Sequence, residues 1–556
     1  MVQSLWYCEG HRGDDDSHHS TKNIFVNLIS CEDIGLKGDK MGKKKGIFSA
    51  LISFAIVAMV MAFAPATQAK AEVIGDWEFK DSSGTIYISK YLGTDKEVTV
   101  PTSAEINGTK YSIKKIGDGA FSGNNTIEKV TIPAKIKQIG NVAFKNCTNL
   151  KYVRIEGDID DLNSRSTAYS NSGGSRSYNY SAFCHAGSNS TDFTIEFADG
   201  VTRIPGYICA VATEDKRENQ CHVTKVVIAD SVIEIGPASF ACCQDLEVVE
   251  GGKGVEVVGG YAFSNCGKVK TLNNFSALKT IGEYAFLSTP ALESVAMGEK
   301  LTEIQKFAFH KSGIKVLDVP KNVTKIGDAA FAECNRLESV NIQAPSISLG
   351  AVAFKNCTML NSLKIAGNIA NGDSRSTSYS NTGGSRYYNY SWFYNAGANA
   401  ESFTIEFGNG VERIPSYMCA TGTERNGGVQ CHVTKGSIPD SVTEVGGCAF
   451  YNCVELADVT FGKGIKSIED SAFKLCSSLK SAEIPNTVKT IGKSAFANTK
   501  LKEITIGNKI ETIGDNAFGN IDDFTIKGYT GSCAEDYANK NKIPFISIGV
   551  MAQKFA

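Results

Sequence analysis

The chain has 556 residues, of which 42% are hydrophobic and 21% are charged. This length exceeds what one compact core supports, and the composition is not that of a disordered chain. We therefore expect several domains or one array of repeats. The 57 basic and 59 acidic residues leave a formal net charge of −2, which argues against a broad surface for nucleic acid or anionic membrane.

A segment with the features of a secretory signal peptide spans residues 41–71. Three lysines at positions 43–45 precede the apolar run from Ile47 to Phe63, and Ala69-Lys70-Ala71 fits a cleavage site. The run is marginal for a bilayer span, which needs roughly 20 apolar residues, and an uncleaved anchor is the alternative. We expect a secreted or cell-surface protein with no membrane span in the mature chain.

Residues 1–40 precede this segment and show no apolar periodicity. Signal peptides stand at an N-terminus, so we hypothesise that Met41 is the true start and that 1–40 is an unstructured, mistranslated leader. The codons for Gly38 to Met41 can resemble a bacterial ribosome-binding site followed by a start codon. Peptides from 1–40 in mass spectra of the expressed protein would contradict this hypothesis.

A motif of the form Ile-Gly-x-x-Ala-Phe recurs at spacings of 22 or 23 residues, with two gaps of 96. A short alternating segment, such as Ile127-x-x-Val130-x-Ile132, accompanies it and predicts a strand with one buried face. One such unit cannot bury its apolar face alone, so the stacked units predict a solenoid. The expected interior anchors are Phe121, Phe144, Phe240, Phe263, Phe286, Phe309, Phe331, Phe354, Phe450, Phe473, Phe496 and Phe518.

The repeated unit, L-x-x-[IV]-x-I-P followed by V-x-x-I-G-x-x-A-F-x-x-C, resembles the BspA-like leucine-rich repeat family from about residue 75 to residue 549. The resemblance implies a β-rich solenoid over 111–528 with short parallel strands, one per repeat. It also implies an N-terminal β cap at 72–110 and a C-terminal cap and tail at 529–556. Members of the family are mostly secreted or surface proteins, and some are adhesins for host matrix proteins.

Both 96-residue gaps contain the same sequence, because residues 143–246 align on 353–456 at an offset of 210. A block of about 210 residues was therefore duplicated. We read the gaps as irregular inserts at about 156–230 and 366–440, each with two turns that carry long loops. In the first copy, Cys209 occupies an anchor position and Phe183 is a further candidate anchor.

The loops at 164–180 and 374–390 are rich in Ser, Gly, Asn, Tyr and Arg. This composition is typical of binding loops on a rigid scaffold, although a solvated excursion without a ligand is the alternative. The candidate contacts are Tyr169, Arg176, Tyr178, Tyr180, Tyr379, Arg386, Tyr388, Tyr390 and Trp392.

Eleven of the 17 cysteines fall into two groups. Seven lie three residues after an anchor, where we expect small, buried, unbridged side chains: Cys147, Cys243, Cys266, Cys334, Cys357, Cys453 and Cys476. Two further pairs, Cys209–Cys221 and Cys419–Cys431, flank variable stretches and are candidate disulfides in an exported protein, with buried free thiols as the alternative.

Catalytic and metal-binding patterns are weak in this sequence. Cys221 and His222 are adjacent on an expected strand and would point to opposite faces, so they cannot act as a nucleophile and base pair. A calcium site around Asp158 is disfavoured because Asn368 replaces that aspartate in the second copy. The outward positions of the strands carry no aromatic ladder for a glycan and no basic stripe.

We therefore expect no enzyme, metal or cofactor. The favoured function is binding of a protein from the host matrix or a bacterial surface, and hence adhesion. A structural extracellular protein without a specific ligand is the alternative, and a repeat-borne enzyme is the least favoured.

Overall fold

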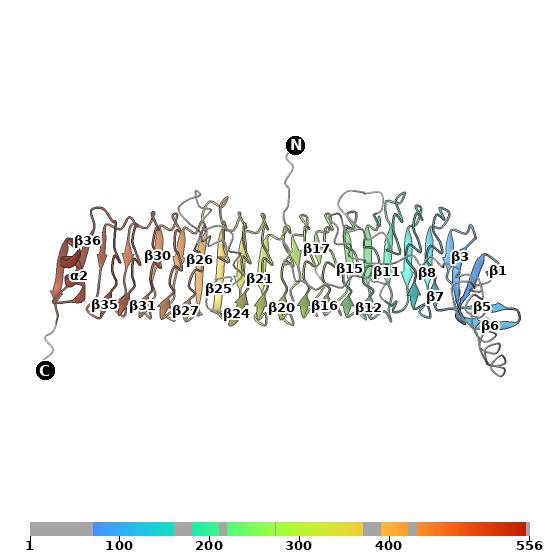
Figure 1. The fold of residues 1–556 in the computed structure, drawn as a ribbon, viewed down its shortest axis with the longest axis horizontal. Helices are drawn as coiled ribbons and strands as arrows, with labels where there is room; N and C mark the ends of the chain where they lie inside the picture. The colour runs from blue at the N-terminus through green and yellow to red at the C-terminus, as the bar shows by residue number, and fades with distance from the viewer. Residues whose placement is uncertain are drawn as a thin grey trace, which may run out of the picture. The chain divides into compact units, whose positions relative to one another are not determined.

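The structure is a computed structural model that describes residues 71–160, 181–210, 220–272, 274–370, 391–420 and 431–551. All of them belong to one unit, Ala69–Ala556. Within it, consecutive turns of the chain lie side by side in sequence order, as a β solenoid (Figure 1). The leader predicted at 1–40 and almost all of the predicted signal peptide lie outside the described residues.

A first series of strands carries the alternating segments of the repeats. These strands are β4 (Glu97–Thr99), β8 (Lys129–Ile132), β10 (Tyr152–Ile155), β11 (Thr194–Phe197), β13 (Lys225–Ile228), β15 (Val248–Gly251), β17 (Thr271–Leu272), β19 (Ser294–Val295), β21 (Val316–Val319), β23 (Ser339–Ile342), β25 (Ser362–Ile369), β26 (Thr404–Gly410), β28 (Lys435–Ser437), β30 (Asp458–Thr460), β32 (Ala482–Glu483), β34 (Glu503–Thr505) and β36 (Thr525–Thr530). In β8, Val130 and Ile132 are buried and Thr131 is half-exposed, as the alternation predicts. Neighbouring strands of this series pair in parallel, for example Val130 with Val153.

A second series of mostly shorter strands holds the Ile, Val or Leu that precedes a glycine in most turns. They are β7 (Lys115–Ile116), β9 (Gln138–Ile139), β12 (Arg203–Ile204), β14 (Glu234–Ile235), β16 (Val257–Val258), β18 (Thr280–Ile281), β20 (Glu303–Ile304), β22 (Lys325–Ile326), β24 (Ser346–Leu349), β27 (Arg413–Ile414), β29 (Glu444–Val445), β31 (Ser467–Ile468), β33 (Thr490–Ile491) and β35 (Thr512–Ile513). The glycine that follows is needed for close packing of turns. A β-carbon on Gly140 would lie 2.4 Å from the backbone of Gly117 in the preceding turn.

The anchor phenylalanines form the interior of the solenoid, as the sequence predicts. All twelve are at most 2% exposed. Rings of successive turns stack with centroid separations from 4.6 Å, between Phe121 and Phe144, to 5.6 Å, between Phe496 and Phe518. Each stacked pair contributes about 0.5–1.5 kcal/mol beyond the burial of its area. Phe183 extends the same stack, 4.9 Å from Phe144, and is therefore an anchor as well.

Backbone hydrogen bonds join the corners of successive turns around each anchor. The amide of Phe121 donates to Ala143 at 2.8 Å, and the amide of Gly119 donates to Asn141 at 3.0 Å. To make these bonds, the residue two positions before an anchor adopts a left-handed backbone even where it is β-branched, with φ of 49° at Val142 and 50° at Val352. The sequence pattern does not predict this conformation.

Different elements occupy the two segments expected to form caps. Near the N-terminus, β1 (Glu72–Ile74), β2 (Trp77–Ser82) and β3 (Thr85–Tyr91) are antiparallel, and β5 (Ser103–Ile106) pairs with β6 (Thr109–Ser112). At the other end, α2 (Cys533–Asn541) precedes β37 (Phe545–Val550). The Tyr537 ring of α2 packs edge-on against the last anchor, Phe518, at 5.8 Å. In the part of the chain that the structure describes, no helix has the length and apolar character to cross a membrane.

Candidate functional site

The two inserts are continuous with the solenoid. Strand β11 of the first insert lies between β10 and β13, and β26 of the second lies between β25 and β28. Phe393 of the second copy stacks on Phe354 at 5.3 Å, as Phe183 stacks on Phe144 in the first. Both inserts thus return to a stacked turn of the solenoid at Phe183 and at Phe393.

Most of the predicted binding residues fall in 161–180 and 371–390, outside the described residues. They are Tyr169, Arg176, Tyr178, Tyr180, Tyr379, Arg386, Tyr388 and Tyr390. The structure describes the ninth, Trp392, which is 1% exposed and donates from Nε1 to the carbonyl of Leu349 at 3.1 Å. The prediction of Trp392 as a surface contact is therefore wrong in this structure, because its side chain is buried in the core.

The seven cysteines after the anchors form the expected ladder. All seven are buried free thiols, and the structure shows hydrogen bonds from them to the preceding turn. Sγ of Cys147 donates to the carbonyl of Phe121 in the preceding turn at 3.1 Å, and Cys266 bonds Phe240 in the same way. Burial raises the pKa of Cys147 to about 12. A thiol with so high a pKa is unreactive at neutral pH.

Each insert also holds a cluster of three buried thiols. In the first copy these are Cys209, Cys221 and Cys243, which lie within hydrogen-bonding reach of one another. Cys243 donates to the carbonyl of Cys209 at 3.5 Å, so Cys209 occupies an anchor position, as the sequence predicts. The second copy repeats the cluster with Cys419, Cys431 and Cys453. The two predicted disulfides remain predictions, and in each copy a third thiol lies beside the pair.

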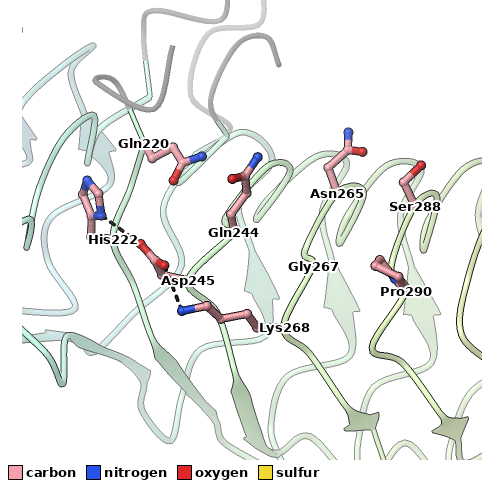
Figure 2. Close-up of a pocket in the computed structure, with 9 residues that line it drawn as sticks. All are labelled: Gln220, His222, Gln244, Asp245, Asn265, Gly267, Lys268, Ser288 and Pro290. Carbon is pink, nitrogen blue, oxygen red and sulfur yellow. Dashed lines mark hydrogen bonds and ion pairs between the residues drawn. The ribbon is translucent and has the colours of Figure 1, made fainter. Parts of the chain in front are cut away.

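An open groove of about 630 Å³ begins at the end of the first insert and crosses the turns that follow it, at the corners between the anchors and the strands. Figure 2 shows its lining as two rows. The outer row has one polar side chain from each of four successive turns: Gln220, Gln244, Asn265 and Ser288. The inner row consists of His222, Asp245, Gly267, Lys268 and Pro290.

The charged groups of the inner row neutralise one another. Nδ1 of His222 lies 2.9 Å from Oδ2 of Asp245, and Nζ of Lys268 lies 3.1 Å from its Oδ1. Burial opposes ionisation of Asp245, but these two hydrogen bonds outweigh it and lower the pKa of its carboxyl. Nε2 of His222 is buried and has no hydrogen-bond partner among the described residues. The groove therefore offers many hydrogen-bonding groups and little net charge.

The second copy keeps the histidine pair but not the groove lining. Nδ1 of His432 lies 2.8 Å from Oε1 of Glu455, the counterparts of His222 and Asp245. The residues aligned with Gln244, Asn265 and Lys268 are instead Val454, Leu475 and Ser478. Only the first block thus has the continuous polar row.

Two other features were missed in the sequence. A stack of three rings, Tyr261, Tyr284 and Phe307, runs along the corners with centroids 4.6 and 4.9 Å apart. These rings cover each other's faces, so the stack offers edges rather than a flat platform. A second groove, of about 910 Å³, crosses β30, β32 and β34, and Glu483 and Thr505 are among its lining residues.

The suspected calcium site has a structural explanation. Oδ1 of Asp158 accepts the amides of Thr202 and Arg203 at 2.6 and 3.1 Å. In the second copy, Oδ1 of Asn368 accepts the amide of Glu412 at 2.8 Å. The position requires an acceptor oxygen rather than a charge, and no group that could hold a metal ion is found among the described residues.

The repeat was compared with known protein families. The description "BspA type Leucine rich repeat region (6 copies)" matches residues 102–207, 216–338, 302–423 and 428–526. The chain belongs to the BspA type leucine-rich repeat family. The resemblance drawn from the motif and the predicted solenoid fold are both confirmed.

Solved structures of bacterial leucine-rich repeat proteins are similar to this chain. One from Bacteroides ovatus is 21% identical with a TM-score of 0.45, and covers 86% of this chain and 99% of its own. A leucine-rich cell surface protein from Faecalibacterium prausnitzii is 23% identical (TM-score 0.30, 84% and 97%). The pneumococcal vaccine antigen PcpA is 13% identical (TM-score 0.25, 87% and 99%). A search of curated proteins found no match.

Proposed function

We propose that this BspA type repeat protein is an exported binding protein that mediates adhesion to host matrix or bacterial surface proteins. The observation that carries the proposal is that two related Tyr-rich sequences, 164–180 and 374–390, are each followed by a matched, stacked turn. Each of these sequences ends three residues before an anchor, Phe183 or Phe393, that is stacked into the core. Rigid scaffolds with variable polar and aromatic loops are typical of binding proteins.

The spacing of the two loops favours a repetitive or extended partner. About eight turns separate Phe183 from Phe393, and at about 4.8 Å per turn the two attachment points lie roughly 40 Å apart. If both loops engage one fibre or one surface, the second contact is intramolecular. Avidity then exceeds the affinity of either loop by about 10²–10⁴.

The test is binding of residues 72–556 to immobilised fibronectin, fibrinogen, laminin and collagen. Replacing Tyr169, Tyr178 and Tyr180 by Ala should weaken binding about 10²-fold or more, because only one loop remains. The same change at Tyr379, Tyr388 and Tyr390 should have a similar effect, and both together should abolish binding. Tyr111→Ala, in the β6 hairpin, is the matched control.

Two outcomes would count against the proposal. Retention of full affinity after loss of both loops would place the site elsewhere on the solenoid. Failure of the parent protein to bind any of these proteins or intact bacteria would favour a structural extracellular protein without a specific ligand.

We propose the same compartment that the sequence predicts. Residues 41–71 act as a signal peptide, and the mature chain starts near residue 72. Expression in a bacterial host should place the protein outside the cytoplasm with a new N-terminus near Glu72. Retention of peptides from 41–71 in the exported protein would instead support an uncleaved anchor.

A further inference from the structure

We propose that the groove lined by Gln220, Gln244, Asn265 and Ser288 binds a linear, neutral oligosaccharide. This site is independent of the two loops and goes beyond the adhesion proposed above. It lies at the corners of the turns and not on the outward face of the strands, where the sequence argues against a glycan groove.

The chemistry of the outer row matches sugar hydroxyls. A carboxamide carries both donors and an acceptor, and a serine hydroxyl is both donor and acceptor. A sugar hydroxyl has the same dual character, so Gln244 and Ser288 can pair with it in both directions. Gln220 is only 6% exposed, and Nδ2 of Asn265 already donates to Ser264 Oγ at 3.3 Å, which leaves the carbonyl of Asn265 as its acceptor.

The charge balance of the groove favours a neutral ligand. Asp245 is paired with both His222 and Lys268, and Lys268 also lies 3.3 Å from Glu247. No cation is left unpaired within the lining that could select a phosphate, sulfate or carboxylate. An anionic ligand would have to compete with Asp245 and Glu247 for Lys268.

The spacing of the row favours a sugar chain over an extended peptide. Successive turns repeat about every 4.8 Å, the distance between hydrogen-bonded strands. An extended peptide advances about 3.3 Å per residue, and its groups on one side recur about every 6.6–6.8 Å. Such a peptide runs out of register with the row, whereas a linear glycan that advances by one ring per turn stays in register.

The floor of the groove leaves room for sugar rings. A β-carbon added to Gly267 would meet no atom within 4 Å, so the space above this residue is open. Pro290, at the end of the inner row, is exposed and offers an apolar surface to the C–H face of a ring. Side chains from four turns then fit a ligand of about four sugar units.

The second copy supplies substitutions that the fold already accepts. Its residues give the triple variant Gln244→Val, Asn265→Leu and Lys268→Ser. Asn265 has a left-handed backbone with φ of 59°, and Leu475 holds the same conformation with φ of 67°. The variant should therefore fold while losing the polar row.

The experiment measures binding of residues 72–556 to cellohexaose, laminarihexaose, xylohexaose, mannohexaose and chitohexaose by calorimetry. At least one should bind, with affinity rising from the disaccharide to about the tetrasaccharide. The triple variant should bind that sugar about tenfold more weakly or worse, because several hydrogen bonds are lost. The matched control Gln343→Val, Asn361→Leu and Lys321→Ser changes exposed residues elsewhere and should bind normally.

Three results would overturn the proposal. One is a parent protein that binds none of these sugars at millimolar concentration. Another is a triple variant with the parent melting temperature and undiminished sugar affinity. The third is preference for sulfated oligosaccharides or for an extended peptide library, which would assign the groove to another class of ligand. Binding to matrix proteins through the loops would be unaffected by any of these results.

Discussion

The two copies of the duplicated block have matching interiors but different surfaces. In the interior, Phe263 stacks on Phe286 at 5.6 Å, and their counterparts Phe473 and Phe496 stack at 5.2 Å. The buried thiol clusters are repeated as well. On the surface, by contrast, the polar row of the first copy is replaced by residues such as Val454 and Leu475.

This difference separates residues that the fold requires from residues that it leaves free. A buried ring or thiol has neighbours in both adjacent turns, so its identity is fixed by packing. A corner side chain is more exposed and has fewer packing neighbours, so it can change at less cost to the stack. The comparison therefore directs tests of stability to buried positions that are equal in both copies, and tests of the groove to surface positions that differ.

The largest expected effect tests the equality of the interiors. Phe263→Ala and Phe473→Ala should each destabilise the protein by about 3–5 kcal/mol, because each leaves a cavity in the stack. Hydrogen exchange should report the loss in the mutated turn and its neighbours, since repeats contact only adjacent repeats. Tyr261→Ala, at a half-exposed corner, is the control and should cost much less. Very different losses of stability from the two substitutions would show that the interiors of the two copies are not equivalent.

The next effect concerns the thiol clusters. In the exported protein, bridges between Cys209 and Cys221 and between Cys419 and Cys431 should each stabilise the fold by about 3 kcal/mol. Peptide mapping without reduction should find both bridges, and reduction should lower the melting temperature. Cys266 is the internal control, since its thiol should stay free. A map that pairs Cys243 or Cys453 would show that the third thiol of each cluster takes part.

A smaller effect is expected at Asp158, whose counterpart Asn368 has no charge but accepts a backbone hydrogen bond in the same way. Asp158→Ala should cost about 1.5–3 kcal/mol, since amides of the next turn lose a charged acceptor. Asp158→Asn, the residue of the second copy, should cost far less.

The pH dependence of these variants follows from the pKa of Asp158. Burial opposes its ionisation, but hydrogen bonds from Thr202 and Arg203 outweigh it, so this pKa lies below the usual range. Because the pKa is lowered by folding, the ionised carboxylate stabilises the folded state fully above its unfolded pKa of about 3.9. This stabilisation is lost as the pH falls through the folded pKa. The stability difference between the parent and Asp158→Ala, measured by denaturant melts, should therefore shrink from pH 7 to pH 3. A constant difference would contradict this role.

The smallest effect concerns backbone strain that both copies share. Val142 and Val352 hold left-handed conformations that β-branched residues disfavour. Asn accepts this conformation more readily, so Val142→Asn and Val352→Asn should each stabilise by roughly 0.5–1 kcal/mol. Val352→Thr, which keeps the branch, should bring no such gain. Melting temperatures that fall for both Asn variants would show that packing of the valine outweighs its strain.

Much of the fold could be predicted because its causes are local and repeated. The spacing of the Phe anchors gave the turns, and the alternation around Val130 gave the strands. The irregular anchor position of Cys209 could also be predicted, because Ile204 stands five residues before it, as Ile116 stands before Phe121. The left-handed residues could not be predicted, since they follow from bonds between turns and fall on residues as unlike as Val142 and Tyr261.

The groove could not be predicted because its members are far apart in the chain. Gln220, Gln244, Asn265 and Ser288 are ordinary polar residues, separated by more than twenty positions. Only the stacking of the turns brings them into one row. One signal was available in the sequence when the turns are aligned on their anchors. Asn265 and Ser288 then occupy the same position, two residues after Phe263 and Phe286.

The hydrogen bonds between corners also determine how this protein carries load. Each turn is held to the next by parallel strand pairs, by corner bonds such as that from Phe121 to Ala143, and by one stacked ring. A force applied between the ends therefore acts on many similar, weak joints in series. Turns peel away one at a time at similar forces, and the chain lengthens in steps while the remaining turns stay folded. A solenoid with this response dissipates a sudden pull through stepwise extension.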